Sequence, residues 1–331
     1  MCFILLFIFS KTFYFSFLEK SVIALYNNKQ SLINSYQSVH YPSKLLLFGE
    51  YSVLRGSQAL AIPYAQFGGR WAYSRDVSKQ MDMSKWVVYL ENLVKTGEIA
   101  LDTEGVHQAL KKGLYFNSNI PRGYGAGSSG ALVAALYDVY GLNKDLSIND
   151  LKIVLGKIES FFHGSSSGLD PLVSYLQKAV LINKDKSIAV LENVKTDAHM
   201  FLLDTHQPRK TEPLVHFYLN KCEQVPSFNA LIENELVPHV DDAIVSFLQN
   251  KTSLLFDIVH QISFFQYRFF TEMIPLHIKN VWLEGLSSDV YKLKLCGAGG
   301  GGFVFGFCHD IVNAKKVLSK MGFNVLPITG V

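Results

Sequence analysis

The chain of 331 residues is 49% hydrophobic and 18% charged, and its formal net charge is +3. This composition excludes an intrinsically disordered chain, and the length is enough for two domains. No block of like charge indicates a surface for nucleic acid or for a membrane, and the four cysteines and ten histidines lack the spacing of a zinc site or a disulfide framework.

The first 38 residues are predicted to be an apolar extension outside the fold. Residues 1–9 are almost wholly apolar, but Lys11 interrupts the run. The segment lacks the basic start and the small-residue cleavage site of a signal peptide, and it is too short for a clean transmembrane helix. We expect a cytoplasmic protein with no membrane association. A membrane anchor and a start assigned too far upstream are the alternatives.

The folded unit is expected to begin near His40, with a buried strand at 44–48. An apolar run at 59–62 predicts a short strand that ends at Pro63, and residues 106–116 have the spacing of a helix. Further helices are expected at 131–140, 151–162, 171–176, 211–222, 227–249 and 253–270, and further strands at 180–182, 188–191, 200–203, 291–295 and 303–307.

These elements predict an α/β (α+β) protein with a boundary between two halves near 194–199. We place the first domain at 39–195 and the second at 196–331. No internal repeat is present, and the one low-complexity tract is a glycine run near the C-terminus.

The first segment whose residues suit binding or catalysis is a glycine-rich turn before an apolar helix. Gly123, Gly125 and Gly127 alternate along it, and Ser128 and Ser129 follow. Glycines let the backbone approach an anion closely, and the N-terminus of the next helix adds its positive dipole end. The segment is neither a lysine-bearing P-loop nor a dinucleotide fingerprint. It predicts a phosphate cradle, and a glycine-rich helix start without a ligand is the alternative.

The second segment carries two carboxylates. Glu159 lies at the end of a predicted helix, and a serine-rich loop leads to Asp170. One carboxylate on a metal and one near a hydroxyl can divide the work of a transfer reaction. The alternative is a surface carboxylate followed by a serine-rich turn.

The third segment is the glycine run at 297–302 between two strands. Because glycine weakens a strand interior, the run indicates close approach of another backbone or of a phosphate chain. A flexible hairpin loop is the alternative.

The fourth segment is Lys44 at the start of a buried strand. An unpaired buried ammonium is costly, so Lys44 needs a partner, and Asp170 is the natural candidate. We predict a direct contact between them beside the loop at 127–129. A lysine at the surface edge of the strand is the alternative.

Together and in this order, the segments resemble the motifs of the GHMP kinases. The pattern E-x-x-x-H-G-x-x-S-G-x-D, from Glu159 to Asp170, is similar to that of the mevalonate kinases within this family, and the stretch from Asp204 to Thr211 is similar to the start of their second domain. The matching positions are Pro42, Lys44, Gly49, Glu50, Pro121, Gly123, Gly125, Gly127, Ser128, Ser129 and 297–302.

The resemblance implies a two-domain GHMP kinase-like fold with the active site in the cleft between the domains, and an ATP-binding first domain. It implies Asp170 as the catalytic carboxylate, Lys44 as its partner, and Ser129 and Glu159 as ligands of Mg²⁺. The positions it assigns to ATP are Gly123, Gly125, Gly127, Ser128, Ser129, Gly299, Gly300 and Gly301.

The reaction implied is ATP-dependent phosphorylation of a small-molecule alcohol, with mevalonate as the first expectation. Ser43, Cys296, Ser166 and Pro171 depart from the glycine, threonine, proline and asparagine that are usual in the family. These departures leave open a kinase for phosphomevalonate, homoserine or a sugar, and a non-catalytic metabolite sensor of the same fold. A homodimer is left open as well, and no nucleic-acid partner is expected.

Overall fold

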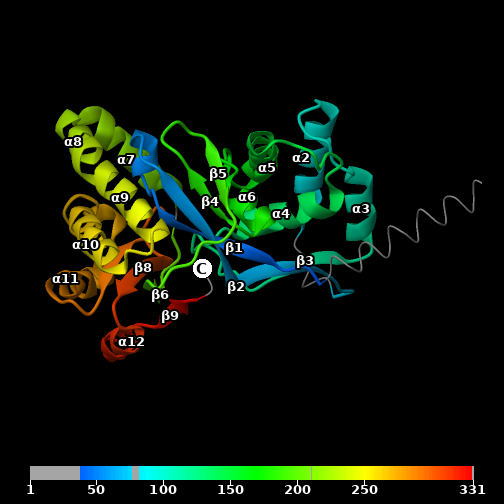
Figure 1. Cartoon of the computed structure of the whole chain (residues 1–331). Helices are drawn as coiled ribbons and strands as arrows, with labels where there is room; N and C mark the ends of the chain where they lie inside the picture. Colours follow the sequence, from blue (N-terminus) through cyan, green and yellow to red (C-terminus); the bar gives the residue numbers. More distant parts are fainter. Residues whose placement is uncertain (1–37, 77–81, 210, 330–331) are drawn as a thin grey trace, which may run out of the picture.

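The computed structural model describes residues 38–76, 82–209 and 211–329. The predicted N-terminal extension falls almost wholly outside the described residues. From Tyr41 onward the chain forms two antiparallel sheets with helices packed around them (Figure 1). The predicted mixed α/β class is therefore confirmed.

The first sheet consists of β1 (Tyr41–Phe48), β2 (Ala59–Tyr73), β3 (Leu114–Ser118), β4 (Ala179–Ile182) and β5 (Ile188–Leu191). The second consists of β6 (His199–Asp204), β7 (Lys292–Leu295), β8 (Phe303–Cys308) and β9 (Val325–Ile328). The helices are α2 (Ser84–Lys95), α3 (Thr103–Lys111), α4 (Ser128–Tyr140), α5 (Ile148–His163), α6 (Leu169–Leu176), α7 (Thr211–Gln224), α8 (Pro226–Leu231), α9 (Val237–Leu248), α10 (Thr252–Phe269), α11 (Lys279–Ser287) and α12 (Ile311–Lys320). Short helical turns are η1 (Ser52–Arg55), η3 (Ile232–Leu236), η4 (Thr271–Met273) and η5 (Leu276–Ile278).

The prediction that Pro63 ends a short strand is wrong, because β2 continues to Tyr73. β2 pairs with β1 along one edge, and on the other edge it pairs with β4 at 59–61 and with β3 at 69–73. Pro63 lies between these two stretches, where β2 has a strand on one side only. A proline, which lacks the backbone N–H, is tolerated at such an unpaired edge.

The helix predicted at 106–116 is wrong in its second half. α3 ends at Lys111, Gly113 takes a left-handed φ of 89°, and Leu114 begins β3. β3 is specified by pairing with the far end of β2, which periodicity within the segment does not reveal. The single helix expected at 227–249 is divided into α8, the π-helical turn η3 and α9.

Helices α4 and α6 cover β1 and β2, and α5 packs against both helices. Nine of the thirteen residues of α4 are buried, which explains why its sequence is apolar on every side. α4 and α6 approach closely at Gly130, where an added Cβ would lie 2.8 Å from the Cβ of Asp170. The sheet and these helices therefore fix the position of Asp170 relative to β1.

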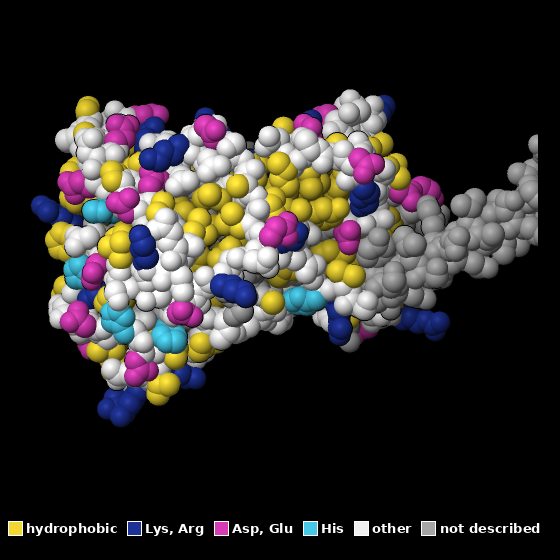
Figure 2. Space-filling view, viewed as in Figure 1, with side chains coloured by type: hydrophobic (Ala, Val, Ile, Leu, Met, Phe, Trp, Pro, Cys, Tyr) yellow, Lys and Arg dark blue, Asp and Glu magenta, His cyan; other side chains and the backbone are white. Residues whose placement is uncertain are grey.

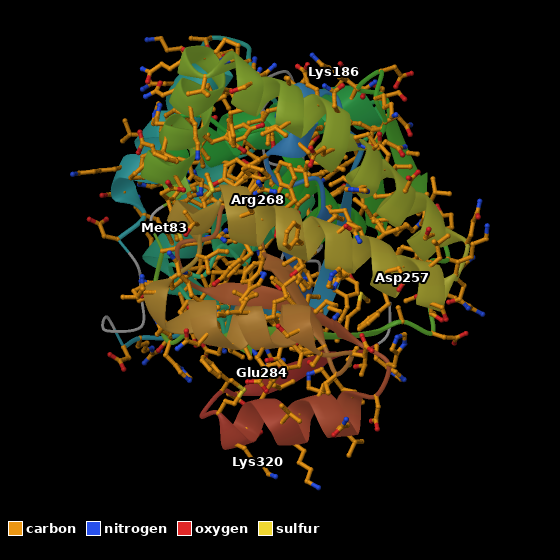
Figure 3. All side chains as sticks on the ribbon, turned by 90° about the vertical axis from the view of Figure 1, so that its left-hand side faces the viewer. Met83, Lys186, Asp257, Arg268, Glu284 and Lys320 are labelled. Atoms are coloured by element: carbon orange, nitrogen blue, oxygen red, sulfur yellow. The ribbon has the colours of Figure 1, made fainter. Side chains whose placement is uncertain are left out.

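The second half packs α10 and α11 against β7, and α12 against β9 and β6 (Figures 1 and 3). Phe48 at the end of β1 stacks on Phe307 of β8, with ring centroids 5.8 Å apart. Lys294 Nζ lies 2.6 Å from Glu50 Oε1, and both side chains are buried. Buried apolar residues of both halves form one continuous cluster. We propose that the domains meet at 195/196, within the segment between β5 and β6.

On the face in Figure 2, charged side chains of both signs are scattered, and apolar side chains gather over the region where Figure 1 places α5 and α6. Among the described residues, no helix has the length and apolar character needed to cross a membrane.

Candidate active site

The glycine-rich turn forms a loop that leads directly into α4. Gly123, Gly125 and Gly127 have φ values of 75°, 66° and 72°, which side-chain-bearing residues rarely adopt. α4 begins at Ser128, so its free backbone N–H groups and positive dipole end lie at the loop. The local geometry is that of an anion-binding loop.

The contact predicted between Lys44 and Asp170 is confirmed. Lys44 Nζ lies 2.5 Å from Asp170 Oδ1, and the Lys44 side chain is 9% exposed. A Cβ added to Gly127 would lie 3.3 Å from Lys44 N and 3.4 Å from Asp170 Oδ2, so the pair is beside the loop. β1 supplies the lysine, and the first turn of α6, after the left-handed Gly168, supplies the carboxylate.

Glu159 lies on α5 and is 3% exposed. Its carboxylate accepts hydrogen bonds from Ser129 Oγ at 2.8 Å and from Ser166 Oγ at 2.5 Å. Burial and the nearby charge of Asp170 raise the pKa of Glu159 to about 7, against the opposing effects of the two hydroxyls and of Lys44. Ser129 and Glu159, the expected metal ligands, are therefore in direct contact.

This donor set fits Mg²⁺, which prefers carboxylate and hydroxyl oxygens and commonly takes few protein ligands. Within the described part of the chain, no group of three or more His, Cys, Asp or Glu side chains could hold a metal ion. A cation at Ser129 and Glu159 would therefore depend on further oxygens from a ligand, as in sites where substrate phosphates complete the coordination.

The second glycine run packs against protein backbone. A Cβ added to Gly299 would lie 2.5 Å from the carbonyl oxygen of Met273, and one added to Gly301 would lie 2.5 Å from that of Gln207. Gly300 donates its N–H to the carbonyl of Met273 at 2.6 Å. The run was expected to allow close approach of another backbone or of a phosphate chain, and close approach of another backbone is observed. A role for Gly299, Gly300 and Gly301 in ATP binding remains a proposal.

Arg209 links the two glycine-rich loops, a role that was not predicted from the sequence. Its backbone N–H donates to the carbonyl of Gly123 at 2.8 Å, and its Nη1 donates to the carbonyl of Cys296. A Cβ added to Gly125 would lie 1.5 Å from Nη2, so the guanidinium lies directly on this glycine. The available signal was its place in the stretch that is similar to the mevalonate kinases.

Two further side chains complete the site. Ser166, a departure from the family pattern, holds Glu159 and also accepts the N–H of Gly168 at 3.0 Å. His163 Nε2 lies 2.9 Å from Ser129 Oγ. Both residues come from the segment between Glu159 and Asp170, so this stretch supplies the surroundings of the carboxylates as well as the carboxylates themselves.

Comparison with known proteins agrees with the motifs. Residues 88–178 match the model of the GHMP kinases N terminal domain. A mevalonate kinase of Dictyostelium discoideum is 22% identical over 362 residues, which cover 86% of this chain and 92% of the relative.

Solved structures share the fold. The L. major mevalonate kinase in complex with R-mevalonate has a TM-score of 0.62 at 14% identity, over 88% of this chain and 95% of that one. The Lactococcus lactis galactokinase complexed with galactose also has a TM-score of 0.62, at 16% identity, over 93% of this chain and 98% of that one. At such identities the likeness establishes the fold. Residues 88–178 therefore form a GHMP kinase N-terminal domain, and over most of its length the chain is similar to proteins named mevalonate kinase.

Proposed function

We propose that the protein transfers the γ-phosphoryl group of ATP to the hydroxyl of a small molecule, and that mevalonate is this acceptor. The observation that carries the proposal is the ion pair of Lys44 and Asp170 at 2.5 Å, beside the glycine loop at the start of α4. It unites a carboxylate, a cation and an anion-binding loop from three separate elements.

In the reaction, the acceptor oxygen forms a bond to the γ-phosphorus, the bond to the β-γ bridging oxygen breaks, and ADP leaves. The proton of the acceptor hydroxyl passes to Asp170. Oδ1 of Asp170 is engaged by Lys44, so Oδ2, which faces the loop, is the oxygen that would receive it. Lys44 offsets part of the negative charge that Asp170, Glu159 and the phosphates bring together.

Ser129 and Glu159 would hold Mg²⁺. When bound, the ion neutralises charge on the phosphate oxygens. Gly123, Gly125 and Gly127 let the backbone of the loop approach the phosphates, and the N-terminus of α4, with Ser128 as its first residue, points its N–H groups at them. Gly299, Gly300 and Gly301 are proposed to close this site from the second half.

The choice of mevalonate rests on the segment from Glu159 to Asp170 and on a relative named mevalonate kinase that covers most of this chain. A sugar kinase is the second candidate, because the galactokinase structure has the same TM-score as the mevalonate kinase structure.

The test is a coupled assay of ADP release with mevalonate, phosphomevalonate, homoserine and galactose at equal concentrations. We expect mevalonate to have the highest kcat/KM. Faster turnover of galactose or homoserine would replace mevalonate by that acceptor. ADP release that no alcohol accelerates would refute the kinase proposal.

A further inference from the structure

The charges of three cations act on the buried thiol of Cys296. Burial raises the pKa of Cys296 to about 11, and the positive charges of Arg209, Lys294 and Lys44 each oppose this rise. Lys294 has Glu50 as its counter-ion at 2.6 Å, and Lys44 has Asp170 at 2.5 Å. Arg209 differs, because none of the ion pairs between described residues includes it.

The guanidinium of Arg209 is also short of hydrogen-bond acceptors. Nη1 donates to the carbonyl of Cys296, but Nε is buried and has no partner among the described residues. A guanidinium has five N–H donors, and a half-buried cation with neither a carboxylate nor a full set of acceptors is costly. The protein keeps the cation in this place without supplying the matching anion itself.

The position of the guanidinium indicates which anion would neutralise its charge and accept its hydrogen bonds. It lies on Gly125, in the middle of the loop whose glycines suit a phosphate chain, and Nη2 would be 2.7 Å from a Cβ added to Gly297 in the second glycine run. The planar fork of arginine matches two phosphate oxygens at once. The unpaired charge therefore faces the junction of both loops.

We propose that Arg209 binds the phosphate chain of the nucleotide, and that it couples the second half of the chain to the nucleotide held on the first. This inference rests on the proposed function in taking the anion to be a nucleotide. Because the backbone of Arg209 is tied to Gly123 and its side chain to Cys296, one residue connects both glycine-rich loops to the same ligand.

The test measures binding of Mg·ADP by calorimetry, with no acceptor present, to the parent, Arg209→Gln and Arg209→Lys. A charge-assisted hydrogen bond lost from a bidentate site is expected to weaken Mg·ADP binding about 10- to 100-fold in Arg209→Gln. Arg209→Lys keeps the charge but loses the fork, so we expect an intermediate loss of at least about threefold. Adenosine, which has no phosphates, should bind all three proteins with equal affinity. This affinity is measured by displacement of a fluorescent nucleotide analogue.

Arg268→Gln is the matched control. Arg268 is an exposed arginine on α10 with its guanidinium over the ring of Phe269 (Figure 3), and its loss should leave Mg·ADP binding at the parental value. Thermal midpoints identify any variant that fails to fold. If Arg209→Gln is one of these, Arg209→Lys decides the question.

Mg·ADP affinity that is unchanged in the folded variants, or an acceptor KM that rises while Mg·ADP affinity stays parental, would overturn the inference. Equal weakening of adenosine and ADP would overturn it as well, since the effect would then not act through the phosphates. A parent that binds Mg·ADP but phosphorylates no alcohol refutes the proposed function and leaves the role of Arg209 standing.

Discussion

Lys44 and Asp170 are expected to act as one unit, and a double-mutant cycle measures this. Asp170→Asn keeps the shape of the side chain but removes the proton acceptor, which is expected to lower kcat by about 10²–10⁴-fold. Because the nucleotide loop is intact in this variant, the KM for ATP should stay close to parental.

The free energy that Lys44→Met is expected to cost follows from the burial of the ion pair. Breaking a buried ion pair by removing one partner costs about 3–5 kcal/mol. Lys44 is 9% exposed but Asp170 is 30% exposed, so water compensates part of the loss. We therefore expect Lys44→Met to lower the unfolding free energy by about 2–3 kcal/mol. It should also lower kcat, because the negative charge of Asp170 and the phosphates is no longer offset.

The assay is ADP release at saturating ATP and acceptor for both single variants and the double variant. If the residues act through one another, the double variant should lose no more than about threefold beyond Asp170→Asn. The matched control is Lys178→Met, since Lys178 forms a pair with Glu192 at the same 2.5 Å but is 41% exposed. An exposed pair contributes about 0–1 kcal/mol, so this variant should keep parental kcat. Losses that multiply in the double variant, or an unchanged kcat in Lys44→Met, would refute the reasoning.

Further predictions concern the metal, pH, the glycine run and the N-terminus. Glu159→Gln should shift the Mg²⁺ titration of activity to at least about tenfold higher concentration, and superimposable curves would contradict its role. Without metal, the folded state holds a proton on Glu159 more tightly than the unfolded chain does, so unfolding free energy should fall by about 3 kcal/mol as pH rises from 4.5 to about 7. Urea midpoints of parent and Glu159→Gln at about pH 4 and about pH 8 test this, because the variant should lack this part of the decrease. Gly301→Ala should destabilise the protein by about 3 kcal/mol, since φ is 143° and the added Cβ meets a carbonyl at 2.5 Å, whereas Gly322→Ala, with open space around it, should cost about 1 kcal/mol. A chain starting at Val39 should keep parental thermal stability and activity, and a large loss of either would show that the preceding residues contribute.

Most helices and strands, and most residues of the candidate site, were predicted because the sequence patterns that specify them are local. A buried strand before Gly49 and an apolar helix after Ser129 are specified by hydrophobic runs and by the glycines next to them. Two of the wrong predictions, at β2 and β3, have a common cause. β3 and the long β2 depend on strand pairing between distant segments, and Pro63 is tolerated only because β2 is paired on one side there.

The sequence by itself identified the groups that are proposed to carry the chemistry. Glycine at positions 123, 125 and 127 indicates a backbone in left-handed conformations, and the residue type alone is enough for this prediction. Glu159 and Asp170 were singled out as carboxylates at the two ends of a serine-rich segment, and their roles were implied by the resemblance of that segment to the mevalonate kinase pattern.

Only the tertiary structure showed how these groups lie relative to one another. The pairing of Lys44 with Asp170 was predicted from the cost of an unpaired buried ammonium, but its distance of 2.5 Å exists only in the packed structure. The contact of Ser129 with Glu159 and the packing of the second glycine run on the backbone of Gln207 also join segments that are far apart in the chain. The same holds for the position of Arg209 between the two loops. Charge pairing and close approach depend on distances through space, and these exist only once the sheets and helices have packed into one core.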